Sequence, residues 1–299
     1  MFSAEVYEWG LAVIRAVQQA ASPALTAVMK AVSFAGDVPF YALVLAILFW
    51  CGDTRRGFRI ACAVLFSGAL NTAVKNTLCV PRPFIADSNV GLAAASGYST
   101  PSGHAQLAET FWPLAASGLR KKALRVCAAV VPPLLIGFSR IYLGVHYPSD
   151  VLLGLCVGML ISLGLLLWGD ALAVRAARLP RMIRILCVSV IAFLFNHFSG
   201  GDVELSALFW GFSCGYVLLC ETAAVDGRLG SPLQKALRVI TGCAVLFVLY
   251  ELCSFAGDAL FSGGAELFRF AEYALLGACA SFVLPHLFLR AGLYASARI

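Results

Sequence analysis

Charged residues are scarce in this chain. Only 13% of its 299 residues are Asp, Glu, Lys or Arg, whereas about 25% is usual for a soluble domain. Hydrophobic residues make up 61% of the sequence, and the mean hydropathy is +0.86. Charge-free runs such as residues 151–168 approach the roughly 20 residues with which a helix crosses a bilayer. This composition excludes a soluble domain and predicts an all-α, polytopic membrane protein.

Several functional patterns are also missing. None of the eleven cysteines forms a C-x2-C pair, and almost all lie in apolar runs, where cysteine commonly acts as a small hydrophobe. The sequence therefore indicates neither a disulfide framework nor a zinc site. No basic stripe predicts nucleic-acid binding, although the formal net charge is +6. The first 20 residues lack a clean apolar core, so we expect insertion through the chain's own spans rather than a cleavable signal peptide.

Apolar segments predict about nine transmembrane helices. Residues 1–37 are interrupted by Arg15 and Lys30, so we expect two interfacial helices lying on the bilayer there, with a tenth span as the alternative. The predicted spans are residues 38–52, 58–79, 103–118, 124–145, 150–169, 182–199, 203–222, 235–256 and 266–289.

Basic residues alternate between the predicted loops. The first, third, fifth and seventh loops, and the segment after the last span, are rich in Lys and Arg. The other loops hold few cations, and they also contain acidic residues such as Asp202. By the positive-inside rule, this pattern places the C-terminus in the cytoplasm and the N-terminus outside. The motifs described next then lie on the extracytoplasmic side.

Four short stretches place phosphate-binding residue types on that side of the membrane. Lysine offers a point charge and arginine a planar fork, and both suit phosphate oxygens. Charged residues near hydrocarbon are costly unless they have a function. The stretches are Lys75 with Arg82-Pro83, Pro101-Ser102-Gly103-His104, Ser139-Arg140, and His146 with Asp150.

The spacing within these stretches suggests chemistry. Ser102 is placed to cap the helix that follows it, and a helix N-terminus presents free N–H groups to an anion. Gly103 lets a phosphate approach the backbone, and His104 lies in the first turn beside it. Asp150 lies four positions after His146 across a turn, so a hydrogen bond that orients the ring is feasible. Two histidines at a phosphate site suggest that one attacks phosphorus while the other protonates the leaving oxygen.

Each of these residues also has a structural explanation when taken alone. Lys75 could be a snorkelling lysine at a helix end. Arg140 could form a structural ion pair with a carboxylate such as Asp87 or Asp150. Asp150 could act only as a favourable charge in the first turn of a helix.

Together, in order and spacing (K-x6-RP, PSGH, SR-x5-H-x3-D), the stretches resemble the signature of the type 2 phosphatidic acid phosphatase (PAP2) superfamily. The resemblance implies that His146 is the nucleophile and forms a phosphohistidine, that Asp150 orients it, and that His104 is the general acid. It implies no metal and no cofactor, and the sequence holds no acidic cluster suited to magnesium. It assigns the phosphoryl oxygens to Lys75, Arg82, Ser102, Gly103 and Arg140.

One position departs from the family pattern. Many relatives place an aromatic residue directly before PSGH, whereas this chain has Thr100, with Tyr98 two positions earlier. We expect this difference to change the pocket walls more than the chemistry.

A site level with the headgroups favours a membrane lipid phosphate or diphosphate as substrate, for example polyprenyl diphosphate or phosphatidate. The alternatives are a sugar phosphate, as in the glucose-6-phosphatases of the same superfamily, a phosphotransferase, and a non-catalytic lipid-binding or transport protein. We expect the chain in the bacterial inner (cell) membrane; the sequence does not indicate an oligomeric state. The predicted organisation is interfacial helices at 1–37, a PAP2-like catalytic core at 38–169, and a four-span region at 170–299.

Overall fold

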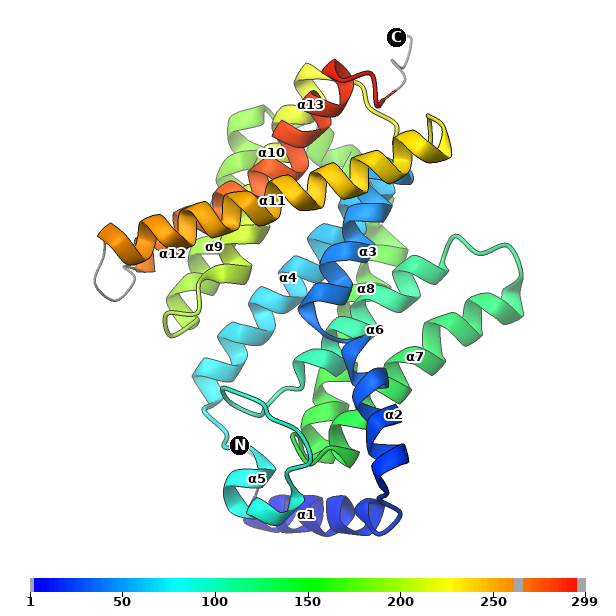
Figure 1. Ribbon diagram of the computed structural model, residues 1–299, viewed down its shortest axis with the longest axis vertical. Helices are drawn as coiled ribbons and strands as arrows, with labels where there is room; N and C mark the ends of the chain where they lie inside the picture. Colours follow the sequence, from blue (N-terminus) through cyan, green and yellow to red (C-terminus); the bar gives the residue numbers. More distant parts are fainter. Residues whose placement is uncertain (1–2, 261–265, 295–299) are drawn as a thin grey trace. The chain divides into compact units, whose positions relative to one another are not determined.

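The computed structural model describes residues 3–260 and 266–294, and within these ranges it contains helices and no strands. The helices are α1 (Ala4–Gln18), α2 (Pro23–Phe34), α3 (Val38–Cys51), α4 (Thr54–Leu78), α5 (Pro83–Ala86), η1 (Ser88–Val90), α6 (Gly103–Ala116), α7 (Lys122–Tyr142), α8 (Pro148–Ala177), α9 (Arg181–Phe198), α10 (Glu204–Thr222), α11 (Pro232–Leu260), α12 (Glu266–Ala278), η2 (Cys279–Val283) and α13 (Leu284–Arg290) (Figure 1).

The predicted spans match these helices closely. Each of the nine predicted spans falls on α3, α4 or α6 to α11, or on the run from α12 to α13. Among the described residues, seven helices are long and apolar enough to cross a membrane, or eight if α2 and α3 form one span bent by 44°. The helix α6 has only 14 residues, so it is shorter than a full crossing. The all-α, polytopic fold is confirmed, and about nine spans remain consistent with it.

The chain divides into two compact units. Unit 1 comprises Met1–Tyr41 and Leu70–Asp170, and unit 2 comprises Ala42–Ala69 and Ala171–Ile299. These units do not test the predicted functional regions, whose boundaries fall at residues 37 and 169, so that division stays a prediction.

Close packing of α6 against α8 shapes unit 1. A Cβ at Gly154 would lie 2.6 Å from the Ser102 carbonyl oxygen, and a Cβ at Gly158 would lie 2.5 Å from that of Gln106. Only glycine lets the two backbones approach so closely. On the other side, the Asn71 side chain donates to Gln106 Oε1 at 2.8 Å. These contacts fix the N-terminal end of α6, where the PSGH motif lies.

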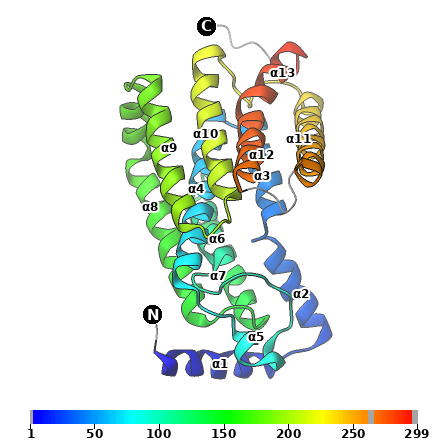
Figure 2. The same ribbon diagram turned by 90° about the vertical axis from the view of Figure 1, so that its left-hand side faces the viewer.

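The helix α1 lies across one end of unit 1, next to α5, in both views (Figure 1 and Figure 2). Ile14 is buried with Val90 and Tyr147. The Gln18 amide donates to the carbonyl oxygens of Val90 and Tyr142, at 2.8 Å each. Thus α1 packs on the loops of unit 1, while its predicted position at the bilayer interface stays a prediction.

Unit 2 is built around α10, which packs along α12 (Figure 1 and Figure 2). A Cβ at Gly277 would lie 2.6 Å from the Leu208 carbonyl oxygen, so glycine allows this close approach. The fully buried Arg238 donates to the carbonyl oxygens of Trp50, Gly227, Leu229 and Leu293. Its charge is therefore used for structure, because carbonyl groups of several segments converge on one guanidinium.

Candidate active site

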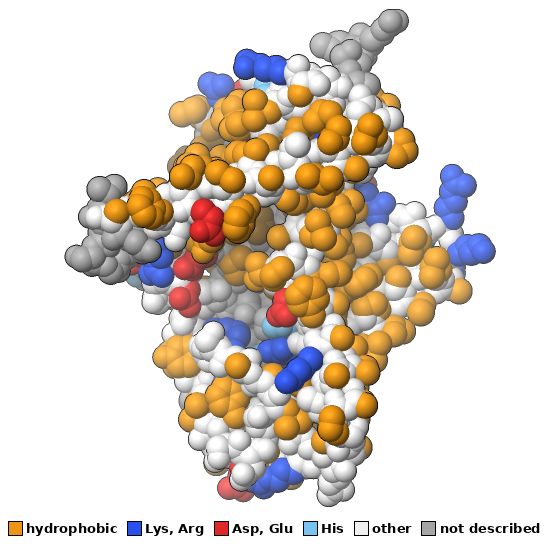
Figure 3. Space-filling view, viewed as in Figure 1, with side chains coloured by type: hydrophobic (Ala, Val, Ile, Leu, Met, Phe, Trp, Pro, Cys, Tyr) orange, Lys and Arg blue, Asp and Glu red, His pale blue; other side chains and the backbone are white. Residues whose placement is uncertain are grey.

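A cavity of about 450 Å³ in unit 1 gathers most of the motif residues. Figure 3 shows cationic side chains in blue beside a pale-blue histidine and a red acidic side chain in a hollow of this face. Residues far apart in the sequence thus meet at one cavity. The motif residues that line it are Lys75, Arg82, Gly103, His104, Arg140 and His146.

Helix ends explain why these residues converge. The helix α4 ends at Leu78, just before Pro81, which cannot donate the next helical hydrogen bond. The helix α8 begins with Pro148 at a position that tolerates proline. Between α7 and α8, Gly144 has a φ of +69°, and a Cβ there would lie almost on the Val90 carbonyl oxygen. This glycine turn places His146 at the cavity.

His146 is held by polar groups on both ring nitrogens. Its side chain is 1% exposed. Nε2 lies 3.2 Å from Arg82 Nη1, and Nδ1 lies 3.4 Å from Ser99 Oγ and 3.5 Å from Asp150 Oδ2. Burial, reinforced by the charges of Lys75 and Arg82, lowers the pKa of His146 well below its usual value, although Asp150 acts in the opposite direction. The ring is therefore neutral at physiological pH.

Asp150 is fully buried behind His146, and short hydrogen bonds fix its carboxylate. Oδ1 accepts from Thr100 Oγ1 at 2.5 Å, and Oδ2 accepts from Ser99 Oγ at 2.5 Å and from the Tyr147 N–H at 2.8 Å. The expectation that Thr100 changes the pocket walls is therefore wrong. Thr100 does not line the cavity, and its hydroxyl binds the carboxylate that faces His146.

Arg82 and Lys75 are tied to the loop that follows α5. Arg82 donates to the carbonyl oxygens of Ser96, Gly97 and Val145 at 2.6–3.0 Å. Lys75 Nζ donates to the Tyr98 carbonyl oxygen at 3.1 Å. These bonds orient both cations, which remain part of the cavity wall.

Arg140 is buried, and its Nη1 donates to Ser33 Oγ at 2.5 Å. Asp87 instead pairs with Arg15 at 2.7 Å, and Asp150 is bound by the hydroxyls described above. The alternative of an ion pair between Arg140 and either carboxylate is wrong, since none forms between these described residues. Arg140 Nε likewise has no hydrogen-bond partner in the described part of the chain. The guanidinium therefore has unused hydrogen-bonding capacity beside the cavity.

Ser102 lies behind the cavity rather than on its wall. It occupies the N-cap position of α6, as its sequence position predicts, but its side chain makes no capping bond. Its backbone N–H donates to the Asp150 carbonyl oxygen at 2.9 Å, while its buried Oγ finds no partner among the described residues. The serine therefore joins the start of α6 to the start of α8, and so links the two motif segments.

Sequence reasoning missed the contribution of residues 30–37. Asp37 Oδ1 lies 2.7 Å from His104 Nε2, Ser33 binds Arg140, and Lys30 lines the cavity. This segment matches no motif, and its contacts span 67 and 107 positions of sequence, so only the fold could reveal them. Ser99 and Thr100 gave a weak signal, because they are polar and directly precede PSGH.

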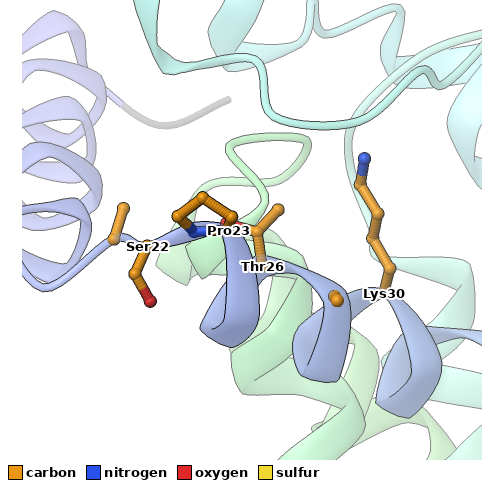
Figure 4. A pocket seen from close by; sticks show the side chains of 6 residues that line it. Ser22, Pro23, Thr26 and Lys30 are labelled. Atoms are coloured by element: carbon orange, nitrogen blue, oxygen red, sulfur yellow. The ribbon is translucent and has the colours of Figure 1, made fainter.

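Lys30 also lines a second pocket of about 440 Å³, together with residues at the start of α2. In Figure 4 the Lys30 side chain extends away from α2, while Ser22, Pro23 and Thr26 lie nearer the start of the helix. Within the described residues its amine forms no hydrogen bond or ion pair. Lys30 thus adds a fourth cation to the three motif cations among the described residues that line the cavity.

Fold and site together define a class: a polytopic membrane protein with a cationic cavity that contains two histidines and suits a phosphate group. The family model described as PAP2 superfamily matches residues 56–173, and the model described as PAP2 superfamily phosphatase, transmembrane extension, matches residues 203–297. This chain belongs to the PAP2 superfamily.

Proteins of a plant and of a bacterium are similar in sequence to this chain. Lipid phosphate phosphatase delta of Arabidopsis thaliana is 29% identical over 51% of this chain, a match that covers only 40% of the plant protein. Phosphatidylglycerophosphatase B of Bacillus subtilis is 30% identical over 46% of this chain and 72% of its own length. The crystal structure of a PAP2-type phosphatidylglycerolphosphate phosphatase from Bacillus subtilis superposes with a TM-score of 0.51 at 26% identity, over 56% of this chain and 88% of that one. The similarity therefore concerns about half of this chain.

Proposed function

We propose that this PAP2 membrane protein is a phosphatase that hydrolyses a lipid phosphate or diphosphate through a phosphohistidine on His146. The observation that carries the proposal is the single cavity at which His104, His146 and the three motif cations meet. The names of the relatives, lipid phosphate phosphatase delta and phosphatidylglycerophosphatase B, support a lipid substrate. Polyprenyl diphosphate and phosphatidate are two such substrates.

In the first step, Nε2 of the neutral His146 attacks phosphorus. An N–P bond forms as the bond from phosphorus to the leaving oxygen breaks, and His104 supplies the proton that this oxygen takes up. A water oxygen then attacks phosphorus while His104 accepts a proton from that water, and the N–P bond to His146 breaks as inorganic phosphate forms and leaves. Asp150 keeps Nδ1 of His146 turned away from the phosphate, because its carboxylate accepts from that side of the ring.

The cationic side chains stabilise the negative charge on the transferring phosphoryl group. Lys75, Arg82 and Arg140 surround the phosphoryl oxygens, and the N-terminus of α6 at Gly103 adds backbone N–H groups. Ser102 supports this helix end from behind. No metal or cofactor takes part in this proposal, because the cations and the helix end supply the positive charge.

The face of the membrane is part of the proposal. The distribution of Lys and Arg over the loops favours a cytoplasmic C-terminus and an extracytoplasmic site in a bacterial cell membrane. Fusions of green fluorescent protein and of alkaline phosphatase to the C-terminus test this in a bacterial host. We expect fluorescence from the first and no activity from the second; the reverse pattern would place the site on the cytoplasmic side.

A substrate panel with detergent-purified protein tests the activity. Phosphate release is measured for a polyprenyl diphosphate, phosphatidate and glucose 6-phosphate, with and without EDTA. We expect turnover of a lipid substrate that EDTA does not reduce, and loss of turnover in His146→Ala and His104→Ala that still fold. Preference for glucose 6-phosphate would make the chain a sugar-phosphate phosphatase, and no turnover of any compound would indicate a non-catalytic lipid-binding protein.

A further inference from the structure

We propose that Asp37, at the junction of α2 and α3, is a positioning residue that holds the His104 ring and keeps it protonated for transfer to the leaving group. This inference rests on the proposed phosphatase function and adds a residue outside the family match, which begins at residue 56. It assigns part of the active site to the N-terminal segment, which the sequence suggested to be a separate interfacial region.

The contact between Asp37 and His104 is short and specific. Asp37 Oδ1 lies 2.7 Å from His104 Nε2, within the range of a charge-assisted hydrogen bond. Both residues line the cavity. Because Nε2 faces the carboxylate, Nδ1 is the ring nitrogen left to give its proton to a leaving oxygen. The contact thus fixes both the orientation of the ring and the atom that donates.

The neighbouring backbone holds this arrangement in place. A Cβ on Gly36 would come within 2.8 Å of His104 Cδ2 and 2.9 Å of Ile136 Cγ2, so the chain runs directly against the imidazole ring. Three residues earlier on the same segment, the buried Ser33 accepts a hydrogen bond from Arg140. Two site residues from two different helices are therefore held by one short stretch of α2 and its junction.

Charge gives Asp37 a second role. Lys75 from α4 and Arg140 from α7 line the same cavity as His104, and like charges repel, so both cations disfavour a positively charged ring. Asp37 is the one carboxylate among the described residues that line the cavity, and it favours the charged ring. A general acid must carry its proton when the bond to the leaving oxygen breaks. Without the Asp37 carboxylate, repulsion by Lys75 and Arg140 would make the His104 ring lose its proton at a lower pH.

The test measures kcat and KM against pH for the full-length protein and for Asp37→Asn, Asp37→Glu and Glu221→Gln. Glu221 is a matched control, because its carboxylate pairs with Arg181 and Arg184 in unit 2. Two substrates are compared: a lipid phosphate, whose alkoxide leaving group needs a proton, and an aryl phosphate with an acidic phenol, which needs one much less. Size-exclusion profiles and unfolding temperatures establish that each variant folds.

We expect Asp37→Asn to lower kcat for the lipid phosphate about 10-fold or more, since general acid catalysis contributes roughly 10²–10⁴-fold. The alkaline limb of its pH profile moves to lower pH, the loss largely disappears with the aryl phosphate, and Asp37→Glu recovers part of the activity. The control behaves like wild type. If Asp37→Asn does not fold, Asp37→Glu and Asp37→Ser carry the same comparison.

Two results would overturn the inference. An equal loss on both substrates with an unchanged pH profile would leave Asp37 with a purely structural role. A lower KM with an undiminished kcat would mean that its carboxylate merely occupies the place of the phosphate. Failure of the phosphatase proposal gives a different result, because wild-type protein would then release no phosphate. If only the Asp37 inference fails, wild type is active and His104→Ala is not.

Discussion

Replacement of Thr100 by valine tests whether the support behind Asp150 matters for catalysis. The substitution keeps the branched shape of a fully enclosed side chain but removes the hydroxyl that donates to Oδ1 at 2.5 Å. Asp150 then keeps its two bonds at Oδ2, from Ser99 and Tyr147, and loses the one at Oδ1. A hydrogen bond to a buried charged group contributes about 1.5–3 kcal/mol.

That free energy sets the size of the expected effect. If the whole loss appears in the transition state, kcat falls about 10- to 150-fold, because each 1.36 kcal/mol corresponds to a factor of ten. If part of it appears in folding, the unfolding temperature falls as well. Phosphate release and thermal unfolding in detergent measure the two parts.

Thr241→Val is the matched control for this substitution. The Thr241 hydroxyl donates to the Leu237 carbonyl oxygen one turn earlier in α11, a helix of unit 2 none of whose described residues lines the cavity. We expect it to leave kcat unchanged. Wild-type kcat and stability in Thr100→Val would refute the idea that a fixed Asp150 carboxylate orients His146.

Three further predictions follow from the cavity. Gly36→Ala should lower kcat about 10-fold or more, because its Cβ would displace His104, whereas Gly164→Ala, which meets nothing within 4 Å, should not. Lys30→Ala should raise KM about 1.5- to 5-fold at low salt and much less at high salt, because an exposed charge is screened; an unchanged KM would contradict this. Because burial lowers the pKa of His146, the acid limb of kcat/KM should lie below about pH 6.5, the ordinary histidine value. The stability that the neutral His146 contributes is fully present above about pH 6.5 and is lost as the pH falls through the lowered pKa. The unfolding temperatures of wild type and His146→Gln should therefore converge in acid.

Much of the architecture could be predicted because the relevant signals are local in sequence. Apolar runs located the long helices, with α8 extending eight residues beyond its predicted end at residue 169, and the resemblance to the PAP2 signature singled out the residues that meet at one cavity: Lys75, Arg82, His104, Arg140 and His146. A helix end or a bilayer crossing needs only neighbouring residues to define it.

The features of the site that the sequence did not predict depend on contacts between residues far apart in the chain. Nothing within residues 30–37 indicates that Asp37 meets a histidine 67 positions later or that Ser33 meets Arg140. Thr100 was misjudged for a similar reason, because its partner Asp150 comes from another helix.

The central claim is that His146 carries the phosphoryl group, and trapping that intermediate tests it most directly. Protein is mixed with a substrate labelled with ³²P in the transferred phosphate, quenched in alkali to preserve phosphohistidine, and digested for mass spectrometry. The account predicts label on the peptide that contains His146 and no label in His146→Ala. Label on any other residue, or turnover by His146→Ala at the wild-type rate, would contradict it.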